Sequence, residues 1–324
     1  MSRLWRSAAQ AFRVLWLLTR RTLREVFADR ILGLAAQAAF WSLLSLPPLA
    51  LVLLGSLGYV GEGLGPQAIA RLETTVVGAA SEVLTPDTVR EVVKPFVTRL
   101  LLQGHPNLAS IGFVISLWSG SAAMGTYVKT ITIAYDMGEL RGAWQGRAIG
   151  FILNIAALAA AIVLLPLLAL GPEIISGFVR GPVGAAAATL VHAVYWPVLA
   201  LLAVAVVATL YHVSVPVRTP WHRDLPGALL AVGLWVGGSL VLRGYLTSSL
   251  RSTDYGPLGA PIAALLFLYI LAFAILLGAE LNSEIDAMWP ADSTAEGRLR
   301  SQTARDRAPV RSKGREPDRP RRPP

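Results

Sequence analysis

Six apolar stretches, each long enough to cross a bilayer as a helix, constrain this chain more than any other feature of its sequence. A helix needs about 20 apolar residues to cross the hydrocarbon core, and a spanning backbone must satisfy its own hydrogen bonds. Only 15% of the residues are charged, whereas about 25% is usual in a soluble domain. We therefore predict an all-α, polytopic integral membrane protein with a six-span membrane domain over residues 30–289. The stretches run over Ile31–Tyr59, Asn107–Tyr135, Ala143–Gly171, Pro182–Tyr211, Leu225–Thr247 and Pro257–Met288.

The basic residues are distributed unevenly about these stretches. Of the 29 Lys and Arg residues, seven precede the first stretch and ten lie in residues 291–324. Together with the loops after the second and fourth stretches, one side of the membrane collects 22 of them and the other side only seven. Because positively charged loops stay in the cytoplasm, we expect both termini to be cytoplasmic, as an even number of spans requires.

Residues 1–29 form a basic segment ahead of the first stretch. Its apolar residues, from Trp5 to Val26, recur at helical spacing. Arginines interrupt every apolar run, which excludes the core of a secretory signal. The pattern predicts a basic amphipathic helix that lies on an anionic leaflet. The alternative is a helix whose apolar face packs against the rest of the protein.

A polar stretch of 45 residues, Gly61–His105, separates the first two apolar stretches. That is too long for a bare loop in a compact domain. Its apolar residues fall on one helical face in each of two segments, so we expect two amphipathic helices against the outer face of the bundle. The two sets are Ile69, Leu72 and Val76, and then Val89, Val92, Val93, Phe96 and Leu100.

Residues 290–324 contain six prolines, many arginines and almost no bulky apolar groups. Such a composition cannot build a core, so we expect a disordered, basic cytoplasmic tail. We expect the basic termini to meet anionic lipid headgroups rather than nucleic acid. The oligomeric state does not follow from the sequence.

Four polar residues lie inside the stretches at similar depth, towards the cytoplasmic side: Gln37, Lys129, Asn154 and Glu280. An ionisable group within a span costs about 2.5–3.5 kcal/mol to insert, and an ion pair between Lys129 and Glu280 would offset that cost. We expect the four to line a polar cavity open to the cytoplasm. The alternatives are a helix-packing network that holds no ligand and, for Lys129, a side chain that reaches the headgroups.

Prolines lie well inside two of the apolar stretches, among them Pro47, Pro48 and Pro197. A proline inside a helix removes a hydrogen bond and kinks or breaks the helix. Transporters use broken helices at their binding sites, so these positions are candidate helix breaks.

The residue types that common enzyme chemistry needs are missing. The chain has no cysteine and four histidines, and no two histidines have the spacing of metal ligands. A phosphate-binding loop, a dinucleotide fingerprint and a nucleophile elbow are also absent. We therefore expect no cofactor, no metal and no enzymatic activity. A metal-dependent ribonuclease would need a His/Asp cluster that activates water.

Several motifs follow one another along the chain. They are Asp29-Arg30, Ala35–Pro48, Pro226-Gly227-Ala228, Leu234-Trp235, Tyr255–Ala260 and Gly278–Asn282. Together, over about residues 25–290, they resemble the YihY/BrkB family of bacterial inner-membrane proteins. The resemblance implies a six-helix integral fold in the inner membrane. One departure is Thr132, where the family usually carries Asn. The family has carried two labels, ribonuclease BN, a tRNA-processing enzyme, and a virulence factor for serum resistance.

The kinked helices, small-residue seams and ionisable groups at membrane depth favour transport or translocation of a small molecule or lipid. A non-transporting scaffold for envelope assembly is the main alternative. A ribonuclease is disfavoured, because its catalytic groups are missing.

Single cysteines introduced into this cysteine-free chain test the predicted topology. In intact cells, a membrane-impermeant thiol reagent should label a cysteine in Gly61–His105, and a cysteine in residues 290–324 should react only after the membrane is opened. Labelling of both positions from the same side would contradict the six-span arrangement.

Overall fold

The computed structural model describes residues 2–64, 106–142, 144–160, 184–249 and 259–307, with short pieces between residues 70 and 98. The elements within this part of the chain are helical, which confirms the all-α prediction. They are α1 (Ser2–Ala28), α2 (Ile31–Leu64), the π-helix η1 (Val89–Val93), α6 (Pro106–Ala134), the 3-10 helices η2 (Gly138–Leu140) and η3 (Trp221–Asp224), α8 (Gly184–Ser214), α9 (Leu225–Ser249), α10 (Gly259–Met288), α11 (Asp292–Arg307), and a helix over residues 144–160.

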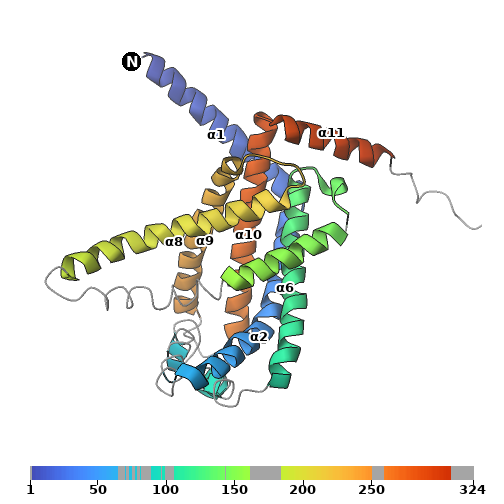
Figure 1. The fold of residues 1–324 in the computed structure, drawn as a ribbon. Coiled ribbons are helices and arrows are strands. Elements are labelled where there is room, and N and C mark those ends of the chain that lie inside the picture. The colour runs from blue at the N-terminus through green and yellow to red at the C-terminus, as the bar shows by residue number, and fades with distance from the viewer. Residues whose placement is uncertain are drawn as a thin grey trace, which may run out of the picture.

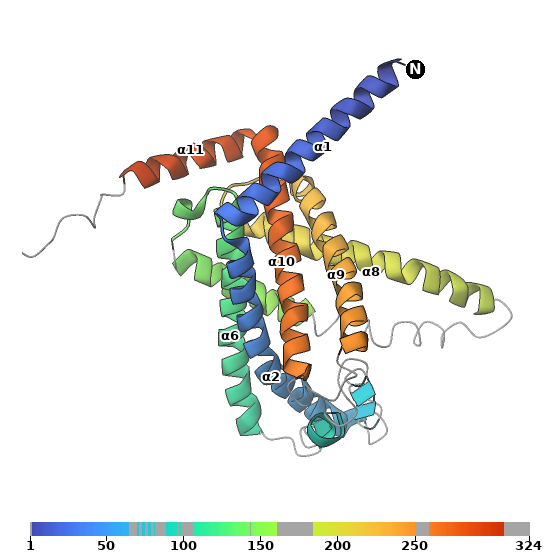
Figure 2. The ribbon, with the colours of Figure 1, turned by 180° about the vertical axis from the view of Figure 1, so that it is seen from behind.

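Helices α2, α6, α9 and α10 run side by side as a bundle, with α10 in its middle (Figures 1 and 2). α10 contacts α1, α2, α6 and α9. Many of the fully buried residues between these helices are alanines, so the backbones approach closely. Examples are Ala35, Ala38, Ala208, Ala228, Ala272 and Ala279. At one end of the bundle, called the α1/α11 end, α1 and α11 meet the end of α10 (Figure 1).

The outside of the bundle is strongly apolar. Large side chains such as Val241, Leu201 and Ile152 are well exposed, which suits a lipid environment and not water. Four described helical segments are long and apolar enough to cross a membrane, and they make the chain an integral membrane protein. They are Ile31–Leu49, Pro197–Ser214, Trp221–Tyr245 and Pro261–Met288. The total of six spans stays a prediction, because residues 161–183 lie outside the described part of the chain.

α8 and the helix over residues 144–160 run at a steep angle to the bundle in both views (Figures 1 and 2). α8 joins the bundle at its C-terminal end, where it packs against α6 and α9. There the Thr132 hydroxyl donates hydrogen bonds to the carbonyl oxygens of Val128 (2.7 Å) and Ser214 (3.2 Å). The residue that departs from the family pattern thus joins α6 to α8.

The candidate helix breaks at Pro47, Pro48 and Pro197 are not breaks in the structure. α2 continues through Pro47 and Pro48, and α8 continues through Pro197. Neighbouring groups in a membrane bundle can satisfy the backbone that a proline leaves free. α2 still changes direction in its second half (Figure 1).

The N-terminal segment forms the predicted helix, α1. One face of it packs against the protein, and the rest of its apolar side chains are exposed. Leu18, Thr22 and Val26 are buried at a spacing of four residues, on a face that packs against the protein. Trp16 and Phe27 are exposed on the rest of the helix, where they are available to lipid.

The expectation of a disordered tail over residues 290–324 is wrong for α11, which covers Asp292–Arg307. α11 is held by polar contacts and not by an apolar face, which a composition argument does not detect. The Thr294 hydroxyl donates to Asp286 Oδ1 (3.0 Å) and accepts from the backbone N–H of Ala291 (3.1 Å). The Ser293 hydroxyl donates to the carbonyl oxygen of Arg218 (2.8 Å). Residues 308–324 lie outside the described part of the chain.

The polar insert is described only in pieces. Residues 89–95 and 97–98 are helical, within the second predicted amphipathic segment. The remainder of Gly61–His105 is too sparsely described to test the two-helix prediction.

α9 and α10 cross in backbone contact at Gly227 and Gly278. A Cβ on Gly227 would overlap the carbonyl oxygen of Gly278, and a Cβ on Gly278 would overlap the carbonyl oxygen of Gly227 and the hydroxyl of Tyr211. That hydroxyl donates a hydrogen bond to the carbonyl oxygen of Ile275 (2.6 Å). Both glycines belong to the family motifs, and the close approach explains why neither position accepts a side chain.

Gly278→Ala should lower the stability of the detergent-solubilised protein by roughly 1–3 kcal/mol, the usual cost of overpacking. Gly233→Ala on α9 is the matched control, because nothing lies within 4 Å of a Cβ built there, and it should be neutral or slightly stabilising. Thermal unfolding of the two variants measures the difference, and equal midpoints would show that the crossing can relax.

Candidate functional site

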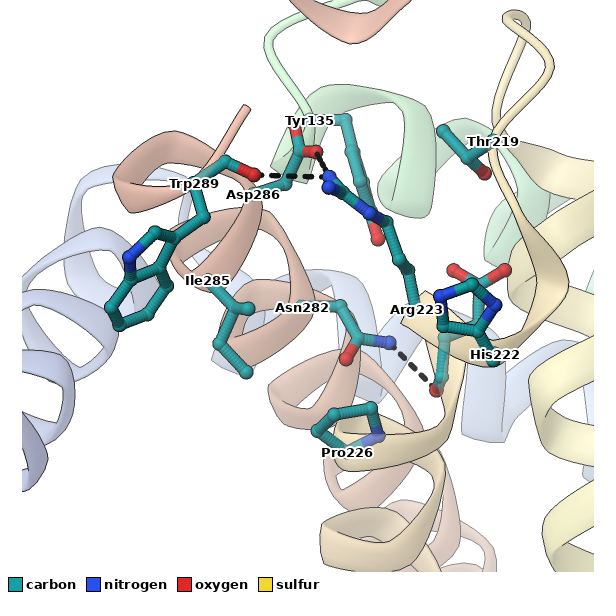
Figure 3. Close-up of a pocket in the computed structure, with 10 residues that line it drawn as sticks. Tyr135, Thr219, His222, Arg223, Pro226, Asn282, Ile285, Asp286 and Trp289 are labelled. Atoms are coloured by element: carbon teal, nitrogen blue, oxygen red, sulfur yellow. Dashed lines mark hydrogen bonds and ion pairs between the residues drawn. The ribbon is translucent and has the colours of Figure 1, made fainter. Parts of the chain in front are cut away.

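A cavity of about 270 Å³ opens at the α1/α11 end, between the end of α10 and the turn that leads into α9 (Figure 3). Its walls combine apolar side chains with charged groups. The lining residues are Tyr135, Thr219, His222, Arg223, Asp224, Pro226, Asn282, Ile285, Asp286 and Trp289.

Asn282 joins the two sides of this cavity. Its amide nitrogen donates to the carbonyl oxygen of Asp224 (3.0 Å), and its amide oxygen accepts from the backbone N–H of Gly227 (2.7 Å). Because the first N–H groups of a helix have no partner within the helix, Asn282 satisfies one at the start of α9. The side chain therefore fixes η3 and α9 against α10.

Asp286 is the centre of an ion-pair network on the same face of α10. It is almost fully buried and lies 3.2 Å from Arg223 and 3.5 Å from Arg298. Arg223 also donates to the carbonyl oxygen of Trp289 (3.0 Å), as Figure 3 shows. Arg298 reaches from α11 and donates to the carbonyl oxygen of Ser283 (3.1 Å). The network thus ties η3 and α11 to the end of α10.

A second buried carboxylate, Asp224, is 1% exposed at the end of η3. Its Oδ2 lies 3.4 Å from Nδ1 of His212, on α8. The histidine is partly exposed. The contact joins α8 to η3 at the wall of the cavity.

The opposite face of α10 carries Glu280 and Glu284. Glu280 is 1% exposed, and its Oε1 has no hydrogen-bond partner within the described part of the chain. Glu284 lies 3.9 Å from Arg21 of α1. Asn282 points away from Glu280, as a rotation of about 100° per residue requires, so the cavity and Glu280 lie on different sides of α10.

Asp29 and Asp136 belong to the turns next to Glu280. The pKa of Asp29 is raised to about 6, mainly by partial burial and also by the carboxylates of Asp136 and Glu25, against the lowering effect of Arg305. Asp136 is exposed and adopts a left-handed backbone with φ of 59°. This side of the α1/α11 end is therefore rich in carboxyl groups, some of them buried and some exposed.

The structure does not bring the four predicted polar residues together. Glu280 is buried, and Asn154 is half-buried beside Gly120. Gln37 and Lys129 are exposed on α2 and α6, and no ion pair or hydrogen bond within the described ranges joins any two of the four. Their depths are similar, but depth along a helix does not determine the face on which a residue lies. A functional role of these residues stays a prediction.

The sequence analysis missed Asp224, Asp286 and Arg298 as site residues. Asp224 and Asp286 lie at helix ends, where a charged residue is ordinary, and Arg298 lies in the segment expected to be disordered. The family motifs contained the one usable signal, because Asn282 ends one motif and Gly227 lies in another.

His, Asp and Glu side chains do not gather as a metal site in the part of the chain that the structure describes, where no group of three is placed to hold an ion. The arrangement can instead bind a molecule with both polar and apolar parts. The polar groups of His222, Arg223 and Asp286 suit a polar part, and Pro226 and Ile285 suit an apolar one.

Comparisons with known proteins agree with these observations. The family model described as virulence factor BrkB matches residues 22–303. A protein of Bacillus subtilis (strain 168), named ribonuclease-like protein YfkH, is 27% identical over 268 residues, which cover 81% of this chain and 94% of that protein. No solved structure matches this chain.

Asp286→Asn should release α11 from the end of α10, because it removes the charge that pairs with Arg223 and Arg298. Charge-assisted hydrogen bonds contribute about 1.5–3 kcal/mol each, so tryptic cleavage within α11 should accelerate on the order of tenfold. Glu296→Gln is the control, since its pair with Arg300 is exposed and contributes little. Equal cleavage rates in the two variants would refute this role of Asp286.

Proposed function

This chain belongs to the virulence factor BrkB family, and from that membership and the cavity we propose that it translocates a small amphiphilic molecule, such as a membrane lipid. The protein is then a multi-pass protein of the bacterial inner membrane with both termini in the cytoplasm. The basic residues before the first span and after the last one support this orientation.

The observation that carries the proposal is the position of the cavity at the end of two spans. The span Pro261–Met288 is about 42 Å long at 1.5 Å per residue, whereas the hydrocarbon core is about 30 Å thick. Its end, with Asp286 and Trp289, therefore reaches the headgroup region. A cavity there presents charged groups to a headgroup and apolar walls to the chains below it.

Burial of the charged groups adds to this argument. Asp224 and Asp286 are nearly fully buried. Oδ2 of Asp224 lies 3.4 Å from His212 and Oδ2 of Asp286 lies 3.5 Å from Arg298, and neither contact has hydrogen-bond geometry within the described ranges. Buried polar groups normally have closer partners, so a polar group of a ligand in the cavity would improve their hydrogen bonding. The name of the Bacillus subtilis relative brings ribonuclease activity into consideration, but the residues around this cavity do not form a water-activating cluster.

Purified protein in liposomes tests the proposal. Proteoliposomes that contain fluorescent phospholipids should expose inner-leaflet lipid to an external quencher several-fold faster than empty liposomes. Ile285→Trp, which fills the cavity, should slow this exchange at least several-fold. Ala287→Trp is the matched control, because Ala287 is exposed and does not line the cavity.

Two results would contradict the proposal. Exchange at the rate of empty liposomes, across zwitterionic and anionic lipids, would favour the envelope scaffold. Equal rates of lipid exchange in Ile285→Trp and Ala287→Trp would show that the exchange does not pass through the cavity.

A further inference from the structure

Glu280 is a deeply buried carboxyl group that does not line the cavity. It lies six residues before Asp286 on α10. Glu280 and Glu284 share the face of α10 that packs against α1. Its side chain is 1% exposed, and Oε1 has no hydrogen-bond partner within the described residues. An ionised carboxylate in that position would carry a large desolvation cost without compensation.

The charged groups that act on Glu280 are all acidic. They come from each neighbouring element: Glu25 from α1, Asp29 from the turn before α2, Asp136 from the turn after α6, and Glu284 from α10 itself. Like charges at short range cannot all be ionised without cost. Glu280 therefore has groups of its own charge on each of these neighbouring elements.

The nearby cations are engaged elsewhere. Arg21 lies beside Glu284, Arg298 pairs with Asp286 on the other side of α10, and Arg305 acts on Asp29. Lys129, which the sequence analysis paired with Glu280, is exposed on α6. Glu280 thus lacks a basic partner within the part of the chain that the structure describes, and neutralisation by a proton is the remaining way to compensate its burial.

The same acidic groups reach the surface at the α1/α11 end. Asp29 is partly buried and Asp136 is exposed, and both act electrostatically on Glu280. Asp29, with its pKa raised to about 6, can take up and release a proton near neutral pH. The chain therefore offers a buried acceptor and an intermediate group that exchanges with solvent.

We propose that Glu280 is a proton-binding site, reached through Asp29 and Asp136, and that the proton is the ion coupled to translocation. The coupling rests on the function proposed above, whereas the proton site does not. Binding converts the Glu280 carboxylate to the neutral acid, and release returns the proton to water through the same carboxyl groups.

Infrared spectroscopy of the full-length protein in lipid tests the site without any transport measurement. At neutral pH, the wild type should show the C=O stretch of a protonated carboxyl group shielded from water. Glu280→Gln should remove that band, whereas Glu284→Gln should leave it, because Glu284 is partly exposed and lies beside Arg21. Gln resembles the neutral acid in size and polarity, so Glu280→Gln should fold.

A wild-type spectrum without a protonated carboxyl band at neutral pH, or a band unchanged in Glu280→Gln, would overturn the proton site. If Glu280→Gln does not fold, the wild-type spectrum decides alone: a band that disappears only at alkaline pH supports the site.

Proteoliposomes separate the two proposals. A pH gradient should accelerate lipid exchange several-fold in the wild type and not in Glu280→Gln. A Glu280-dependent band without any lipid exchange would leave the proton site standing and refute translocation. If the rate of lipid exchange does not depend on the pH gradient and the protein shows no such infrared band, the proton site is refuted and translocation stands.

Discussion

Hydrocarbon offers no hydrogen bonds, and the arrangement of this protein follows from that constraint. Along most of the bundle, α10 meets its neighbours through alanine and other small residues, and the outer surface is apolar. Groups that need partners gather at the α1/α11 end, where Asn282, Asp286 and Ser283 connect α10 to η3, α11 and α6. The polar chemistry of the protein is therefore concentrated where the helices leave the membrane core.

Helix α10 divides this end into two environments. On one face, Asp286 is balanced by Arg223 and Arg298, and the cavity beside it contains both signs of charge. On the other face, the largest charge effects on Glu280 among the described residues come from carboxyl groups, and Arg21 lies beside Glu284. The rotation between Glu280 and Asn282 creates this separation, so a single helix can carry a ligand wall and a titrating group that do not neutralise each other. Both environments depend on α1 and α11, which lie outside the bundle.

The sequence predicted the long helices closely and the site poorly. The second and sixth apolar stretches, Asn107–Tyr135 and Pro257–Met288, coincide with α6 and α10 to within two residues, because hydropathy and helix length are set by the bilayer. The rotation of each helix is set by packing, and Lys129 and Gln37 therefore lie outside while Glu280 lies inside. α11 was missed because polar contacts replace the apolar face that a stable helix normally shows. They are an ion pair and a hydrogen bond to Asp286 and a hydrogen bond to the carbonyl oxygen of Ser283.

The contact between Gly227 and Gly278 determines which parts of the molecule are free to move. No side chain separates the two backbones there, and Asn282 clamps the same junction from α10 to the first turn of α9. We therefore expect α9 and α10 to move together as one rigid unit. A motion that opens the protein alternately to the two sides of the membrane therefore has to involve the helices around this rigid unit. α8 is the main candidate, because it contacts the unit only near its own C-terminal end.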